Sequence, residues 1–452
     1  MQQQMSKLSI LPNYSIDIEI TYNPHNFALT DLFRMAARIN KKRQFLFVST
    51  VLGKHLAVRP QIPLLTGTLL AMMYQQHLTG QKVMASSVVT ALKDGANLDE
   101  VQKSIEGTLE LTDETLFIGF AETATALGHA VFNAFHSNAM YIHTTREVLP
   151  DFEPFVTFEE EHSHATSHRI YTEEPEFLLQ AKRIVLIDDE ITTGNTVINI
   201  IETLIQKFPL VRQYAVLSIL DWRSQQQQTI FKQLEVQWDI SIEFISIMCG
   251  NFYCSGIPSL TSTQPNLLTQ IARDMDICPI QVSADRKSYR SVAENGLINK
   301  HPYLLATGRF MLTSKQHVDQ KQTIQAIAIQ IQELRTNGPA LVIGTGEFMY
   351  VPMQIASYLG NDVYFQSTTR SPIYCTDDLG YTINDKIAFE SPENNGVTNF
   401  LYNLQSQSYT ELFFLVERIA SKEVVARVVK ALQEATNAKV YVISMHELEV
   451  ER

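Results

Sequence analysis

Residues 183–196 read RIVLIDDEITTGNT, and a helical pattern follows over residues 197–207. The apolar start predicts a buried strand, which ends at Asp188 and Asp189 and leads through a threonine-rich loop into the helix. The loop hydroxyls, the flexible Gly194 and the free N–H groups of the helix start are suited to hold a phosphate. Two carboxylates would repel that phosphate, so they suit ribose hydroxyls or a hydrated Mg²⁺ instead. An ordinary capped helix after a buried strand is the alternative interpretation.

Short apolar segments alternate with helical patterns along the chain, which is typical of a parallel α/β sheet. Ligands of such sheets collect at the carboxyl ends of the strands. We expect an α/β domain over residues 1–255, a linker or cap over 256–300 and a second α/β domain over 301–452. The expected strands are residues 44–49, 115–119, 140–143, 183–187 and 214–220 in the first domain and 340–344, 362–366, 411–416 and 439–444 in the second.

The two halves resemble each other in sequence. LFIGFAE at residues 116–122 corresponds to LVIGTGE at 341–347, and YIHTTR at 141–146 corresponds to FQSTTR at 365–370. The same alignment sets Asp188 and Asp189 against Glu417 and Arg418, so the second half lacks the acidic pair. We therefore predict a duplication with one degenerate half. The alternative is that parallel α/β sheets share such patterns generally.

Composition excludes several classes of protein. The 452 residues include 36 Lys and Arg against 48 Asp and Glu, and the net charge of −12 opposes a general nucleic-acid or anionic-membrane surface. The four cysteines are too few for a disulfide scaffold. Apolar runs stay far below the roughly 20 residues of a membrane span, and no apolar segment of a secretory signal follows the polar start. We expect a cytoplasmic protein with no membrane or direct nucleic-acid partner.

The segment around the acidic pair resembles the fingerprint of type I phosphoribosyltransferases: four hydrophobic residues, two acids, two variable positions and Thr-Thr-Gly-x-Thr. The resemblance implies a Rossmann-like parallel sheet and the donor phosphoribosyl pyrophosphate. Asp188 and Asp189 would hold the ribose 2- and 3-hydroxyls, and the loop would bind the 5-phosphate. The implied loop residues are Thr192, Thr193, Gly194, Asn195 and Thr196.

Two further loops fit this family. Gly53 and Lys54 follow an early strand, where relatives bind pyrophosphate through backbone amides and often a basic residue. Glu122 lies in the loop 119–128, which in relatives lies under the ribose and the pyrophosphate. Taken singly, a solvated Gly-Lys pair and a tightly packed helix start are the alternatives.

A histidine-rich acidic segment after residue 146 is predicted to be a lid over the leaving group. Arg146, His162, His164 and His168 would supply positive charge or a proton there. Orotate-type relatives carry lysines and a glycine in this loop, which this sequence lacks. A transition-metal site formed by the three histidines and ordinary surface histidines remain the alternatives.

The strand end at residues 218–224 is the last candidate region. In purine-type relatives this strand end places an acid near a metal and an aromatic residue near the base. Asp221 would then join Asp188 and Asp189 as a ligand of the implied Mg²⁺. Trp222 would stack on a planar ring and Arg223 would bind an oxygen, unless both serve in packing.

The chain is most similar to orotate phosphoribosyltransferase-like proteins with a C-terminal TRSP domain, encoded in bacterial tellurium-resistance and stress gene clusters. The similarity rests on residues 43–60, 160–165 and 369–372. It implies transfer of the phosphoribosyl group to an unidentified base-like acceptor, in the synthesis or salvage of a nucleotide or nucleoside-like metabolite, by a homodimer. A non-catalytic sensor of the donor and a metal-stress protein are the alternatives. A second-domain ligand surface is expected at Gly344, Glu347, Thr369 and Arg370.

Overall fold

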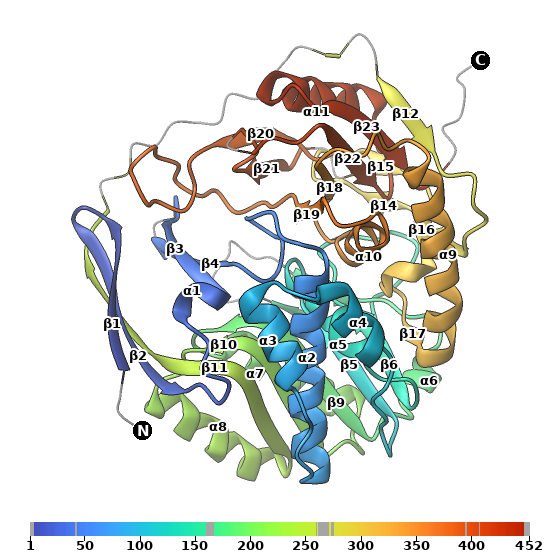
Figure 1. The fold of residues 1–452 in the computed structure, drawn as a ribbon. Helices are drawn as coiled ribbons and strands as arrows, with labels where there is room; N and C mark the ends of the chain where they lie inside the picture. Colours follow the sequence, from blue (N-terminus) through green and yellow to red (C-terminus); the bar gives the residue numbers. More distant parts are fainter. Residues whose placement is uncertain are drawn as a thin grey trace.

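The computed structural model describes residues 4–40, 43–159, 167–258, 260, 271–272, 275–393, 396–405 and 407–446. Two sheets organise these residues, one of eight strands and one of five (Figure 1). Among the described residues, no helix is both long and apolar enough to cross a membrane.

The larger sheet has the strand order β1-β2-β11-β10-β9-β5-β6-β17. Its central strands β5, β6, β9, β10 and β11 run parallel. Strands β5, β6 and β10 and the first part of β9 are buried between helices, and for this reason their sequences are continuous apolar runs. Antiparallel strands form both edges. The strands are β1 (Gln4–Leu11), β2 (Tyr14–Tyr22), β5 (Thr115–Gly119), β6 (Ala139–His143), β9 (Arg183–Ile191), β10 (Gln213–Asp221), β11 (Ser241–Gly256) and β17 (Leu312–Thr313).

The crossovers of this sheet run in opposite directions. From β9 to β10 the chain moves one way across the sheet, and from β5 to β6 it moves the other way. Right-handed connections then place α7 (Asn195–Lys207) and α5 (Ala124–Phe132) on opposite faces. A crevice for ligands is expected where the direction reverses, at the carboxyl ends of β5 and β9.

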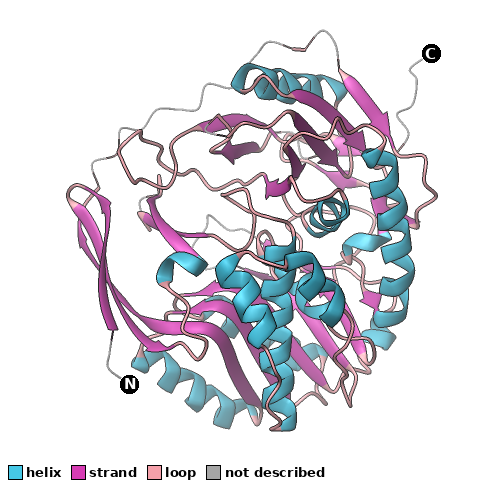
Figure 2. Cartoon of the chain, in the orientation of Figure 1, coloured by secondary structure: helices cyan, strands magenta, loops and turns pink. Residues whose placement is uncertain are grey.

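Helix α7 is amphipathic where it covers the sheet. Val197, Ile200, Ile201 and Leu204 of α7 are buried at the spacing of one helix face. On the side that faces the viewer in Figures 1 and 2, α2 (Gln61–Thr79) packs against α5. The remaining helices of this half are α1 (Leu29–Leu32), α3 (Ser86–Asp94), α4 (Leu98–Ile105), α6 (Pro175–Leu178) and α8 (Gln225–Trp238).

Two hairpins lie outside the large sheet. A strand forms in the predicted range 44–49, but β4 (Phe45–Ser49) pairs antiparallel with β3 (Phe33–Ala37) and not with the parallel strands. Its expected place in the parallel sheet is therefore wrong, because its partner is the segment immediately before it. The segment after residue 146 also contains a hairpin, β7 (Val156–Glu159) and β8 (Ser167–Ile170).

The smaller sheet is entirely parallel, in the order β12-β23-β22-β18-β19. Its strands are β12 (Asp276–Pro279), β18 (Ala340–Gly344), β19 (Val363–Ser367), β22 (Glu411–Val416) and β23 (Lys439–Ser444), with helices α9 (Ser314–Gln332), α10 (Tyr350–Tyr358) and α11 (Lys422–Ala435). Its edge strand β12 comes from the range predicted as a linker or cap. Short pairs complete this half: β13 (Arg286–Lys287) with β16 (Tyr303–Leu304), β14 (Ser291–Val292) with β15 (Ile298–Asn299), and β20 (Lys386–Glu390) with β21 (Thr398–Tyr402), besides the turn η1 (Leu305–Thr307).

The two sheets share a four-strand pattern. The order β10-β9-β5-β6 in the first corresponds to β23-β22-β18-β19 in the second, and the aligned sequence segments fall on corresponding strands. The loops also agree: Thr144 N–H donates to Gly119 O at 2.9 Å, and Thr368 N–H donates to Gly344 O at 3.0 Å. This correspondence supports the predicted duplication.

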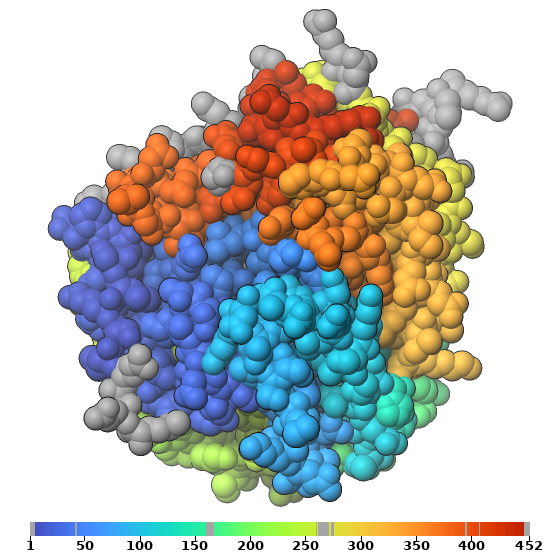
Figure 3. All heavy atoms as spheres, viewed as in Figure 1, coloured from blue at the N-terminus to red at the C-terminus, as the bar shows by residue number. Residues whose placement is uncertain are grey.

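The two halves are in direct contact. Val58 forms a β-bridge with Phe365, and Arg38 forms one with Ile373. In Figure 3 the blue N-terminal surface adjoins the orange surface of the second half. Loops of both halves therefore reach one common region.

Candidate functional site

A polar pocket of about 410 Å³ lies at the carboxyl ends of β5 and β9, where the crossovers change direction. Its walls come from the loops after β4, β5, β6 and β9 and from residues 369–371 of the second half. The pocket therefore occupies the place where parallel α/β sheets bind their ligands.

The acidic wall consists of Asp188, Asp189 and Glu190 at the end of β9. Asp189 N–H donates to Asp188 Oδ1 at 2.9 Å, and Arg43 Nη2 donates to Glu190 Oε1 at 2.5 Å. Burial raises the pKa of Asp189, partly offset by its hydrogen bond with Asp188. Burial also raises the pKa of Glu190, and the neighbouring Arg43 offsets only part of this rise. This wall offers carboxylate oxygens to hydroxyl groups or to a hard cation.

The basic wall is arranged around Glu122, which follows β5. Lys54 Nζ donates to Glu122 Oε1, and both side chains are almost completely buried. Arg146 Nη1 and Arg370 Nε lie 3.9 and 3.8 Å from Glu122 Oε2. Burial would raise the pKa of Glu122, but Lys54, Arg370 and Arg146 hold it below its ordinary value. Three cations thus surround one carboxylate at the pocket wall, a charge excess that suits an anionic ligand.

The threonine-rich loop leads from β9 into α7, and its residues 192–195 lie outside the pocket lining. Gly194 is the N-cap residue with φ +81°, and Thr193 Oγ1 accepts a hydrogen bond from Asn195 N–H at 3.3 Å. Thr196, in the first turn, lines the pocket. The first N–H groups of a helix and its dipole favour an anion at this position.

Substituting Gly194 with alanine is expected to strain this loop. A Cβ would lie 2.6 Å from Phe231 Cε2, and the positive φ costs about 1–2 kcal/mol for a residue with a side chain. We expect a lower melting temperature and weaker binding of ribose 5-phosphate. Gly80→Ala is the control, since Gly80 has φ +67° and open space around it. Equal melting temperatures for the two variants would contradict the close contact, and equal ribose 5-phosphate affinities would contradict the phosphate role.

Asp221, Trp222 and Arg223 lie outside the pocket lining. Arg223 donates from Nε to Asp221 Oδ1 at 2.9 Å and from Nη2 to Asp221 Oδ2 at 2.6 Å, and its guanidinium lies 3.2 Å from the centre of the Phe244 ring. Trp222 is 4% exposed and stacks on Phe47. Asp221 is thus paired with an arginine, and Trp222 is packed against an aromatic ring. The predicted contacts of these residues with a metal and a base stay predictions.

The predicted lid residues are divided between described and other segments. His162 and His164 lie outside the described residues. His168 is buried in β8, where it stacks on Phe158 and shares a hydrogen bond of 2.9 Å with Thr144 Oγ1. Arg146 lines the pocket. The lid stays a prediction.

The second-half residues divide into two groups. Thr369 and Arg370 line the pocket, whereas Gly344 is packed so closely that a Cβ would lie 2.7 Å from Phe348 O. Glu347 accepts from Thr145 Oγ1 at 2.6 Å and from Arg309 Nη1 at 2.5 Å. Burial would raise the pKa of Glu347, but Arg309 holds it at about 2. The expected surface is therefore split between a pocket wall and an interdomain contact.

Sequence reasoning missed several residues of the pocket. Arg38, Arg43, His55 and Glu190 all line it. The basic run at residues 41–43, next to an apolar strand, was a usable signal for Arg43. Gly53, predicted at this site, lies beside the pocket with its backbone against Phe365.

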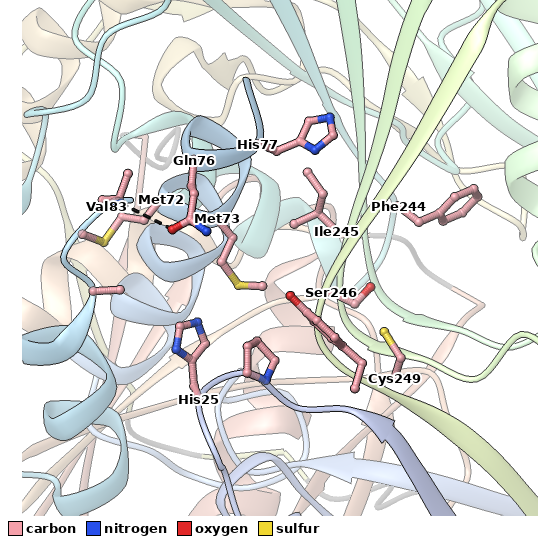
Figure 4. A pocket seen from close by; sticks show the side chains of 13 residues that line it. His25, Met72, Met73, Gln76, His77, Val83, Phe244, Ile245, Ser246 and Cys249 are labelled. Carbon is pink, nitrogen blue, oxygen red and sulfur yellow. Dashed lines mark hydrogen bonds between the residues drawn. The ribbon is translucent and has the colours of Figure 1, made fainter. Parts of the chain in front are cut away.

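A second pocket, of about 440 Å³, lies between α2 and β11 (Figure 4). Met73 and Ile245 point toward it together with His25, whereas Phe244 points to the other side of β11, where it contacts Phe231. In the described part of the chain, no Asp, Glu, Lys or Arg side chain lines this pocket. It is therefore poorly suited to a ligand with several negative charges.

The comparison with protein families agrees with this geometry. Residues 32–251 match the family described as phosphoribosyl transferase, and residues 306–432 match the TRSP domain found C-terminal to it. The chain combines a phosphoribosyltransferase domain with a TRSP domain. The pocket lies in the phosphoribosyltransferase domain, and the TRSP domain supplies residues 369–371 to it.

Solved structures of phosphoribosyltransferases are similar to the chain at low identity. Adenine phosphoribosyltransferase from Trypanosoma brucei, in complex with AMP, pyrophosphate and ribose-5-phosphate, is 14% identical; the match covers 54% of this chain and 86% of that one, with a TM-score of 0.28. Orotate phosphoribosyltransferase from Mycobacterium tuberculosis, in complex with phosphoribosyl pyrophosphate, is 12% identical; the match covers 41% and 89%, with a TM-score of 0.18. No curated protein matches the chain.

A divalent cation fits the acidic wall only together with a ligand. Among the described residues, no group of three or more His, Cys, Asp or Glu side chains is arranged to hold a metal ion. Mg²⁺ is commonly bound by one or two carboxylates, with water and substrate oxygens completing its shell. Asp188 and Asp189 fit that partial role.

Proposed function

We propose that the protein transfers the 5-phosphoribosyl group from phosphoribosyl pyrophosphate to a nitrogen of a base-like acceptor and releases pyrophosphate. The observation that carries this proposal is one pocket with carboxylates on one wall, a cluster of cations on the other and a helix N-terminus at its end. A sugar with hydroxyls between two anionic groups matches those three features in chemistry.

Each wall of the pocket has a part in binding the donor. The N–H groups and hydroxyls at the start of α7 bind the 5-phosphate. Asp188 and Asp189 accept hydrogen bonds from the ribose hydroxyls, and Lys54 and Arg146 attract the pyrophosphate group. Asp188 and Asp189 would also hold Mg²⁺, which would neutralise negative charge on the donor.

The reaction needs no covalent bond to the protein. The acceptor nitrogen forms a bond to C1 of the ribose while the bond from C1 to the pyrophosphate oxygen breaks, and the electron pair leaves with pyrophosphate. The cations of the basic wall stabilise the charge that develops on this leaving group, and the fixed walls orient the reactants. Catalysis is thus electrostatic and positional.

Turnover in the presence of donor, Mg²⁺ and a panel of bases tests this function. We expect pyrophosphate release that depends on one class of base. Tight donor binding without turnover for any base would contradict catalysis and favour a sensor of the donor. Lack of donor binding would contradict both functions.

The remaining expectations concern the division of the chain, its oligomeric state and its location. The division at residues 256–300 and the homodimer stay predictions. The four cysteines are free thiols, which supports the proposed cytoplasmic location.

A further inference from the structure

The two domains contact each other in a reciprocal way. By the sequence correspondence, Glu122 and Glu347 are equivalent, and so are Arg146 and Arg370. Glu347 Oε1 accepts from the Arg146 N–H at 2.9 Å, and Glu122 Oε2 lies 3.8 Å from Arg370 Nε. The glutamate loop of each domain therefore meets the arginine loop of the other. In a two-fold dimer, residue i contacts residue j of the partner and j contacts i in the same manner.

The equivalent helices also meet at this interface. Helix α5 of the phosphoribosyltransferase domain packs against α10 of the TRSP domain. His129 stacks on Tyr350 with ring centres 3.5 Å apart, and both side chains are buried. Contact between corresponding helices is expected near the axis of a two-fold arrangement.

The corresponding site of the TRSP domain is filled by side chains. Arg418, in place of Asp189, is 1% exposed and lies 3.7 Å from the centre of the Tyr303 ring. Its guanidinium donates to Ser291 Oγ at 2.7 Å and to His301 O at 2.7 Å. A cation paired in this way cannot take over the role of a carboxylate toward hydroxyl groups. A duplication would provide two pockets, and of these the pocket of the phosphoribosyltransferase domain remains open.

Arg370 is the TRSP residue best placed to act in the open pocket. Its side chain is 27% exposed, so part of it faces solvent in the pocket. Its guanidinium lies near the Glu122 carboxylate, as do Lys54 and Arg146 of the phosphoribosyltransferase domain. A planar guanidinium can bind two oxygens of a phosphate group at once.

We propose that the TRSP domain acts as an internal partner subunit, which supplies Arg370 to the pyrophosphate group of the donor in the pocket of the phosphoribosyltransferase domain. This inference rests on the proposed function, since it names the residue that the second copy adds to the same site. Arg370 and Arg146 then approach the pyrophosphate from the two halves of the duplication. The pocket requires no second chain to obtain this residue.

Calorimetry on the full chain tests this role with three ligands: phosphoribosyl pyrophosphate with Mg²⁺, inorganic pyrophosphate and ribose 5-phosphate. Loss of a hydrogen bond to a charged group costs about 1.5–3 kcal/mol, so Arg370→Ala is expected to weaken binding of the donor and of pyrophosphate by about ten- to a hundredfold. Ribose 5-phosphate lacks the leaving group and should bind as before. Arg370→Lys should recover part of the affinity.

Arg427→Ala is the matched control. Arg427 is an equally exposed arginine of the TRSP domain, paired with Glu390 and Glu423 away from the pocket, and its loss should change none of the three affinities. Wild-type binding with an unchanged Arg370→Ala variant would overturn the internal-partner role alone. An equal loss for ribose 5-phosphate would also overturn it, because the effect would then be general. If the wild-type protein binds none of the three ligands, the proposed function fails and this role fails with it.

Discussion

Replacing Asp188 and Asp189 together with asparagine abolishes detectable binding of the donor. The two carboxylates form one wall of the pocket, and the substitution replaces four acceptor oxygens by two while adding N–H groups. It also removes the negative charge that would hold a divalent cation. Since hydrogen bonds to a charged group contribute about 1.5–3 kcal/mol each, loss of several of them lowers affinity by more than about a hundredfold.

The measurement is calorimetric titration with donor and Mg²⁺. Asp377→Asn with Asp378→Asn is the control, because this second adjacent pair of aspartates is exposed and lies away from the pocket. The control protein should bind the donor as the wild type does. A double variant at 188 and 189 that keeps its affinity would remove the basis of the proposed site.

The strands of both sheets follow from local sequence more closely than their partners do. Residues 340–344, 411–416 and 439–444 are strands with the predicted limits, because buried parallel strands are continuous apolar runs. Strand β9 continues through the acids to Ile191, since its backbone pairs with β10 whatever side chains it carries. An apolar run does not show which segment pairs with it, and β4 was expected in the parallel sheet although its partner is the preceding strand β3.

The site likewise contains residues that local sequence predicts and residues whose positions depend on distant segments. The motif at residues 183–196 predicts the carboxylates of the pocket and the loop before α7, because those residues are consecutive and the turn itself arranges them. The contact between Glu122 and Arg370 joins loops of two domains, and no local pattern encodes that distance. For Trp222, a position at a strand end allows either a ligand or neighbouring rings as partner. Only the positions of Phe33 and Phe47 decide that it is packed.

Replacing Glu122 with glutamine destabilises the protein by about 3–5 kcal/mol, the range for breaking a buried ion pair. Glutamine keeps the shape of the side chain but leaves Lys54, Arg146 and Arg370 without their shared carboxylate. Lys54 is 1% exposed, so the variant leaves a nearly buried charge without its carboxylate. Thermal unfolding measures the loss. Glu390→Gln is the control, since Glu390 pairs with Arg427 at a quarter-exposed site, where loss of an ion pair costs about 0–1 kcal/mol.

The same variant makes two further effects measurable. Burial lowers the pKa of Lys54 and Glu122 opposes this, so the variant lowers it further. A lysine whose pKa is lower in the folded than in the unfolded state binds fewer protons when folded, and stability then increases as the pH rises toward the unfolded value. The melting temperature of Glu122→Gln should therefore approach that of the wild type from pH 7 to pH 10.

Inorganic pyrophosphate should raise the melting temperature of Glu122→Gln more than it raises the melting temperature of the wild type, because the anion replaces the missing carboxylate among the three cations. A variant as stable as the wild type would contradict the predicted cost of breaking the ion pair. A variant that pyrophosphate does not stabilise further would show that these cations do not form an anion site.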